Sequence, residues 1–189
     1  MKIFNSLFII ILAVFFFGCE SENVELNQIL GDWQLKSTSV DIDIQAENPV
    51  KFDLDLSEYQ YILSFKNDGT YTVKIDKGAI DKLKQLNVEI ANYSLTSSGT
   101  YAINDGVFSI NSKDTNNKTQ KTKFKIAFTG NESFQIEMDK AMYLELIKVE
   151  LESQKSLLAS FGVTVDQVMD QMATDIKKFQ YKSVFIKMK

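Results

Sequence analysis

Carboxylates are the main groups with which this chain could do chemistry. The 189-residue sequence contains no histidine and no arginine, and its single cysteine is Cys19. Without histidine there is no Ser-His or Cys-His nucleophile, no imidazole metal ligand and no imidazole proton carrier near neutral pH. What remains is acid–base chemistry by Asp and Glu, or the binding of a hard cation such as Ca²⁺ by carboxylate oxygens.

Two pairs of aspartates have a spacing that could hold such a cation. Asp41 and Asp43 lie two residues apart, and so do Asp53 and Asp55. On a strand, residues i and i+2 point to the same face, so each pair could present two carboxylates to one calcium ion. A solvated face of a sheet explains the same pattern more simply. We therefore predict no metal site, no catalytic residue and no cofactor, and we expect a protein that is not an enzyme.

The segment before Cys19 has the parts of a secretory signal peptide. Lys2 supplies a positive charge, residues 7–17 are an unbroken apolar run, and the small residue Gly18 comes directly before the cysteine. The run is shorter than the about 20 residues that a membrane-spanning helix needs. The segment resembles a bacterial lipoprotein signal, which implies cleavage before Cys19 and attachment of acyl chains such as palmitate to it. We predict a signal peptide over 1–18 and a lipidated tether over 19–28.

This resemblance implies a location in the bacterial cell envelope. The lipid on Cys19 would hold the protein to a membrane, most simply the outer membrane, because several acyl chains anchor a protein stably where one does not. An uncleaved N-terminus with a buried free thiol is the alternative, but a thiol in an oxidising compartment normally pairs, and this chain offers no second cysteine. The net charge of −4 argues against nucleic acid as a partner, since phosphate binding needs clustered cations.

Eight stretches with period-2 alternation predict a mainly β fold. Asn-Asp-Gly at 67–69 and at 104–106 falls between two such stretches, which is a strong signal for a hairpin. The eight stretches are residues 33–44, 59–65, 70–75, 99–103, 107–110, 123–128, 133–138 and 183–189. We predict one domain over 29–189 whose eight antiparallel strands close into a small barrel.

Two stretches change to helical spacing. Residues 78–93 predict a helix between the third and fourth strands, and residues 140–179 predict a helical hairpin inserted before the last strand. Within the hairpin, Gly162 is placed to end the first helix, and Thr164 with Gln167 has the pattern of a capping box. The apolar stripes should pack over the barrel rim or the adjacent wall. The inward-facing residues would be Leu151, Leu158, Met169 and Met172.

Gly31 and Trp33, at the start of the first strand, resemble the G-x-W signature of the lipocalins. The resemblance implies an eight-stranded barrel that binds apolar small molecules in its interior, with the tryptophan closing one end beneath an arginine from the last strand. This chain has no arginine, so only Lys187 or Lys189 could take that place. The helical hairpin also departs from the family, whose main helix follows the last strand.

Aromatic residues on the predicted strands have two interpretations. They could line a ligand cavity, or they could form a packed core, which is the commoner role. The residues are Phe65, Tyr71, Tyr101, Phe108, Phe124, Phe128 and Phe134. We expect a lipid-anchored, non-enzymatic binder of an apolar or amphipathic small molecule. The alternative is a structural lipoprotein whose filled barrel and helical insert dock another envelope protein.

Overall fold

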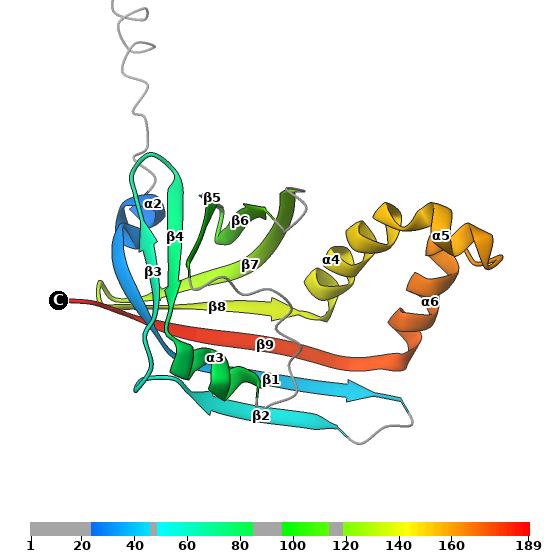
Figure 1. The fold of residues 1–189 in the computed structure, drawn as a ribbon, viewed down its shortest axis with the longest axis horizontal. Coiled ribbons are helices and arrows are strands. Elements are labelled where there is room, and N and C mark those ends of the chain that lie inside the picture. Colours follow the sequence, from blue (N-terminus) through cyan, green and yellow to red (C-terminus); the bar gives the residue numbers. More distant parts are fainter. Residues whose placement is uncertain (1–23, 46–48, 85–95, 114–118) are drawn as a thin grey trace, which may run out of the picture.

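The computed structural model describes residues 24–45, 49–84, 96–113 and 119–189. Cys19 and the predicted signal peptide lie outside these residues. The strands are β1 (Gly31–Ile44), β2 (Val50–Asp55), β3 (Tyr61–Phe65), β4 (Thr70–Ile75), β5 (Thr96–Asn104), β6 (Val107–Lys113), β7 (Thr119–Thr129), β8 (Ser133–Asp139) and β9 (Ile176–Lys187) (Figure 1). The helices are α2 (Val24–Ile29), α3 (Lys77–Lys84), α4 (Lys140–Ser153), α5 (Lys155–Ser160) and α6 (Val165–Asp175). No helix in the described residues is both long enough and apolar enough to cross a membrane.

The strands form a closed antiparallel barrel. Their order is β1-β3-β4-β5-β6-β7-β8-β9, and β9 pairs back with β1 to close the ring. The first residues of β1 pair with β3 and its later residues pair with β2, so β2 and β3 together act as one interrupted strand. The predicted eight-stranded barrel is therefore confirmed. Strand β2 was not among the eight predicted stretches, although Phe52 and Leu54 alternate there with charged residues.

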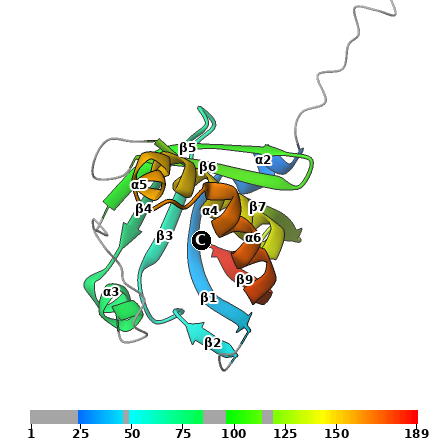
Figure 2. The ribbon, with the colours of Figure 1, turned by 90° about the vertical axis from the view of Figure 1, so that its right-hand side faces the viewer.

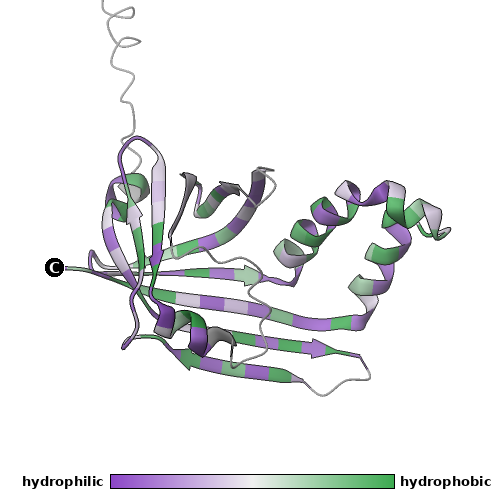
Figure 3. Cartoon of the chain, in the orientation of Figure 1, coloured by the Kyte–Doolittle hydropathy of each residue, from purple (hydrophilic) through white to green (hydrophobic). Residues whose placement is uncertain are grey.

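A β-bulge in β1 decides which of its side chains face the barrel interior. Opposite β9, the register shifts between Leu35 and Ser37. Because the extra residue reverses the alternation, Trp33 and Leu35 face inward before the bulge, whereas Thr38 and Val40 face inward after it. The apolar residues of β1 likewise change from odd positions, at Trp33 and Leu35, to even positions, at Val40 and Ile42. The alternation of polar and apolar residues is visible along β1 and β9 (Figure 3).

The helix predicted between the third and fourth strands is present as α3, between β4 and β5. Asp76 caps its start, since the backbone N–H of Ala79 donates to Asp76 Oδ1 at 2.6 Å. Ala79 and Ile80 are buried against the core. Residues 85–93 of the predicted stretch lie outside the described residues.

The predicted helical hairpin is also present, as α4, α5 and α6. Gly162 ends α5 with φ +73°, and the N–H of Val163 donates back to Leu158 O at 3.1 Å, as in a Schellman motif. Thr164 and Gln167 form the predicted capping box at the start of α6. The prediction of a single first helix was wrong, because the helix is interrupted at Gln154, which lies between the end of α4 and the start of α5.

The end of the hairpin differs from the prediction. Helix α6 ends at Asp175 rather than at 179, and β9 begins at Ile176 rather than at 183. The apolar residues Ile176 and Phe179, which also fit a helical stripe, lie on β9 opposite Ile44 and Ile42 of β1. Residues 176–182 are extended because they form hydrogen bonds with the later part of β1.

The hairpin stands at the barrel rim instead of lying across the barrel (Figures 1 and 2). Its root contacts the rim, where the ring of Tyr143 in α4 stacks on that of Phe179 with centroids 4.0 Å apart. Neither α4 nor α5 has a buried residue. The four residues expected to face inward are only half-buried, so their predicted burial against the barrel is not found. These are Leu151, Leu158, Met169 and Met172.

Asp139 fixes the root of the hairpin and gives a pH-dependent prediction. Its carboxylate accepts from Lys125 Nζ at 2.6 Å and from the N–H of Met142 at 3.0 Å, and these bonds, chiefly that from Lys125, hold the pKa of Asp139 below its usual value. Asp139→Ala should lower the stability of the first turn of α4 by about 1 kcal/mol, the usual cost of losing a cap. Because the pKa is lowered, this stabilisation is present above the ordinary Asp pKa and is lost as the pH falls through the lowered value.

Hydrogen exchange of the α4 amides measures this effect. Asp139→Asn is the matched control, because it keeps an oxygen for the cap and removes only the charge, and an exposed ion pair contributes little. Equal protection of α4 in Asp139→Ala and in the wild type would contradict the assignment.

Candidate functional site

One end of the barrel is closed by Trp33. Its side chain is fully buried, and its Nε1 donates to Ile29 O of α2 at 2.6 Å. Gly31 has φ +111°, a conformation that L side chains rarely adopt, which explains why a glycine begins this strand. Lys187 Nζ lies 5.2 Å from the centroid of the Trp33 ring, so this lysine takes the place that the lipocalin resemblance gives to arginine. Helix α2, which lies within the predicted tether, thus belongs to the folded domain.

The aromatic residues predicted to line a cavity fill the middle of the barrel. Phe65 is central, with its ring centroid 4.9 Å from that of Tyr101 and 5.7 Å from that of Phe108. Phe134 stacks on Phe185 at 4.8 Å. Six of the seven residues are buried and Phe128 is half-buried. The six are Phe65, Tyr71, Tyr101, Phe108, Phe124 and Phe134. These rings pack against one another, as a core does.

Three hydroxyl groups meet inside the barrel, between this aromatic core and the end where the hairpin is attached. We call Thr38, Tyr181 and Ser183 the hydroxyl cluster. Thr38 and Ser183 are buried and lie opposite each other in the β1–β9 ladder. Ser183 Oγ lies 2.8 Å from Thr38 Oγ1 and 2.6 Å from Tyr181 Oη. Among the described residues, Thr38 and Ser183 are the buried ones of polar type, so the cluster gathers hydroxyl groups within a mainly apolar interior.

One assignment of the hydroxyl protons satisfies all three hydrogen bonds that the cluster makes. Thr38 Oγ1 donates to the backbone oxygen of Lys182 at 3.3 Å, and a carbonyl oxygen can only accept. Each hydroxyl has one proton, so Ser183 must donate to Thr38 and Tyr181 must donate to Ser183. Tyr181 Oη therefore has no proton left to donate, but its lone pairs can accept. With this assignment, a molecule that hydrogen-bonds to Tyr181 Oη would donate from an N–H or O–H group.

The inner surface beside the cluster is apolar and partly open to solvent. Val40 pairs with Tyr181 and with Phe52, and Ile42 pairs with Phe179. These side chains are half-buried, unlike the aromatic residues deeper in the barrel. An apolar surface with a few convergent polar groups is the usual composition of a small-molecule site. The hairpin end of the barrel is therefore the candidate site.

Sequence reasoning did not select the hydroxyl cluster. Thr38 becomes an inward-facing residue only because of the bulge, and its proximity to Ser183 depends on the register between the first and last strands. The available signal was weak: Tyr181 and Ser183 share the parity of the buried Phe185, which places two hydroxyls on the apolar face of the last strand.

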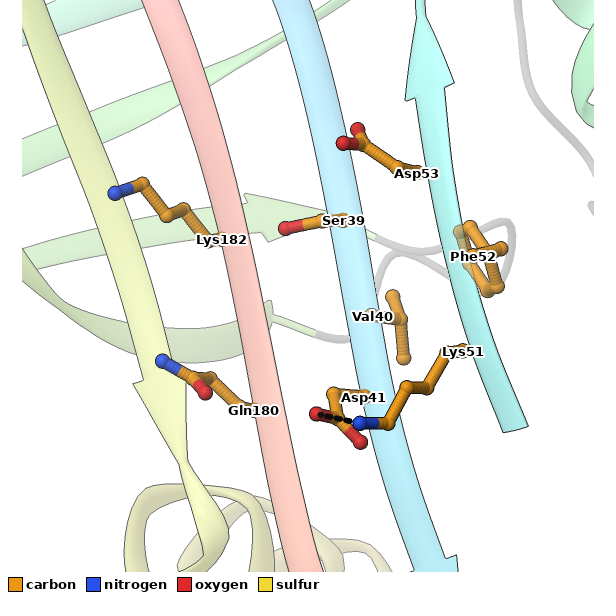
Figure 4. A pocket seen from close by; sticks show the side chains of 8 residues that line it. All are labelled: Ser39, Val40, Asp41, Lys51, Phe52, Asp53, Gln180 and Lys182. Atoms are coloured by element: carbon orange, nitrogen blue, oxygen red, sulfur yellow. Dashed lines mark ion pairs between the residues drawn. The ribbon is translucent and has the colours of Figure 1, made fainter. Parts of the chain in front are cut away.

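The aspartate pairs lie on the outer face of the barrel, where Asp41 and Asp53, one from each pair, line a hollow of about 480 Å³ between β2, β1 and β9 (Figure 4). The carboxylate of Asp41 forms ion pairs with two lysines. Its Oδ2 lies 2.6 Å from Lys178 Nζ and 3.3 Å from Lys51 Nζ. The Lys178 hydrogen bond is the main reason that the pKa of Asp41 lies below its usual value. No group of three or more metal-ligating side chains is found in the part of the chain that the structure describes.

The sequence model of one protein family matches this chain. The family is described as a lipocalin-like domain, and the match covers residues 29–133, which include Gly31, Trp33 and the strands up to the start of β8. No curated protein and no solved structure matches the chain.

Proposed function

Because the chain belongs to the lipocalin-like domain family, whose barrels are typically binding folds, we propose that it is a lipid-anchored, non-enzymatic protein of the bacterial envelope that binds an apolar or amphipathic small molecule. The lipid would be attached to Cys19 after removal of residues 1–18. The ligand would lie at the hairpin end of the barrel, beside the hydroxyl cluster.

One observation carries the proposal. The aromatic core fills the Trp33 half of the barrel, whereas at the other end Val40, Phe52 and Phe179 remain half-buried on β1, β2 and β9, the last of which carries Tyr181. An apolar ligand would remove these side chains from water, and burial of apolar surface is the main favourable term in such binding. The accepting oxygen of Tyr181 favours ligands that carry one N–H or O–H group on an apolar body.

A fluorescent probe with this chemistry tests the proposal. N-phenyl-1-naphthylamine is an apolar amine with one N–H group, and its emission rises when it leaves water. We expect the wild-type protein to bind it and Tyr181→Phe to weaken binding about 2- to 10-fold, the effect of one neutral hydrogen bond. Gln180→Ala, on the exposed outer face of the same strand, is the matched control and should leave the affinity unchanged.

Two results would count against this site. One is absence of probe binding to the folded wild-type protein, and the other is equal affinity of Tyr181→Phe and Gln180→Ala. Independently of the probe, mass spectrometry of organic extracts of the protein purified from its own membrane would identify the natural ligand.

A second candidate function is the docking of another envelope protein. Exposed apolar side chains on the hairpin favour it, because a large apolar group in water often marks an interaction surface. Replacing the insert by a short Gly/Ser loop separates the two functions. If the hairpin gates a ligand, the deletion should speed ligand release, and if it docks a partner, the deletion should abolish partner binding and leave probe affinity unchanged.

A further inference from the structure

The tip of the hairpin exposes large apolar side chains. Phe161 is 74% exposed, Val149 is 62% exposed and Leu157 is 57% exposed. Phe161 lies directly before Gly162, in the Schellman motif that ends α5. The Phe161 ring is therefore exposed at the turn that joins α5 to α6. Exposed apolar side chains of this size often mark a contact surface.

A groove beside the hairpin combines apolar and cationic side chains. It lies between α4 and β7 and has a volume of about 220 Å³. Met142, Leu146 and Val149 contribute a stripe at helical spacing, and Lys121 and Lys123 contribute two ammonium groups from β7. Glu145 Oε1 lies 2.7 Å from Lys123 Nζ, whereas the side chain of Lys121 is exposed.

The chain outside the described residues limits where a membrane could lie. Cys19 is five residues before Val24, the first residue of α2. Five extended residues span at most ~18 Å, so an acyl anchor on Cys19 would keep α2 close to the bilayer. Helix α2, the beginning of β7 and the α4–α5 part of the hairpin all lie on the upper side of the molecule in Figures 1 and 2.

We propose that this side is the face by which the domain rests on a phospholipid bilayer. The proposal depends on the lipid anchor at Cys19 from the proposed function and adds a second contact to it. Val149, Leu157 and Phe161 would enter the boundary between headgroups and acyl chains, as the apolar faces of interfacial helices do. Lys121 would lie at the level of the phosphates, where lysine side chains are attracted to anionic lipids. Two contacts, the anchor and the hairpin tip, would fix the orientation of the barrel on the membrane.

Fluorescent labelling of the acylated protein in vesicles tests this orientation. The vesicles consist of phosphatidylethanolamine and phosphatidylglycerol, and the environment-sensitive dye NBD is attached through a thiol in Phe161→Cys. The matched control is Asp53→Cys, an exposed position on β2, which lies on the lower side of Figure 1. We expect the dye at position 161 to emit at shorter wavelength and to be quenched by spin-labelled lipid, and the dye at position 53 to behave as in water.

The same experiment separates the two proposals. An acylated Cys19 cannot react with the dye, so each variant should carry one dye per chain. Two dyes per chain would show that the anchor is absent and would overturn both the anchor and the bilayer contact that depends on it. One dye per chain with water-like emission at position 161 would overturn the bilayer contact while leaving the anchor intact. That result would point instead to a protein partner for the hairpin.

Discussion

Replacing Trp33 by alanine is expected to lower the free energy of unfolding by about 3–5 kcal/mol, the usual cost of emptying a large aromatic site. The ring is fully buried and lies edge-on to Phe134 with centroids 4.8 Å apart. Its Nε1 is also the partner of Ile29 O, so the substitution would leave a buried carbonyl oxygen without its donor. Equilibrium denaturation in urea, followed by circular dichroism, measures the loss.

Two milder substitutions at the same end of the barrel separate the contributions. Trp33→Phe keeps most of the apolar volume and loses the hydrogen bond, and we expect it to cost about 1–3 kcal/mol. Lys187→Met keeps the aliphatic stem and removes the charge over the ring, and we expect a cost of about 0.5–1 kcal/mol, typical of a cation–π pair at an exposed site. A loss below about 1 kcal/mol for Trp33→Ala would mean that this residue does not close the barrel.

Changing Cys19 to serine is expected to abolish incorporation of palmitate completely, because serine offers no thiol for acylation. The wild-type chain should lack residues 1–18 and gain the mass of its acyl chains, whereas the variant should keep residues 1–18 and gain none. The barrel begins only after this segment, so its circular dichroism and its unfolding transition should stay unchanged. Metabolic labelling with palmitate and intact-mass spectrometry measure both effects.

Ser21→Ala is the matched control for this change, since it alters a neighbouring polar residue and leaves the cysteine in place. It should be cleaved and acylated as the wild type is. Masses that differ only by the exchange of sulfur for oxygen, together with equal membrane retention for Cys19→Ser and for the wild-type chain, would show that Cys19 carries no lipid.

The sequence by itself determined the type and order of most elements. Period-2 alternation and the Asn-Asp-Gly turns predicted the barrel strands, because an antiparallel strand with one buried face must alternate. The G-x-W pair predicted the closed end, where Trp33 is indeed buried and Gly31 has a positive φ. The capping signals at Gly162 and Thr164 were equally local, and the structure confirms both.

Tertiary structure decided the boundaries between helix and strand where the apolar residues fit both the helical and the strand period. Ile176 and Phe179 fit a helical stripe as well as a strand, and pairing with β1 makes them a strand. Likewise, amphipathic stripes on the hairpin predicted burial against the barrel, but a stripe says only that a helix needs a partner, not which one. Helix α4 packs against α6 and, at its root, against β7, β8 and β9, and the tip of the hairpin stays exposed.

The candidate site depended on the tertiary structure for the same reason. Thr38 and Ser183 are 145 residues apart in the chain, and they meet because the last strand closes the barrel against the first. A bulge of one residue in β1 turns Thr38 inward, and without it Ser37 and Ser39 would keep the inward parity of Leu35. Local propensity cannot specify such a register, because it arises from hydrogen bonding and burial across the whole barrel rather than from the residues on either side.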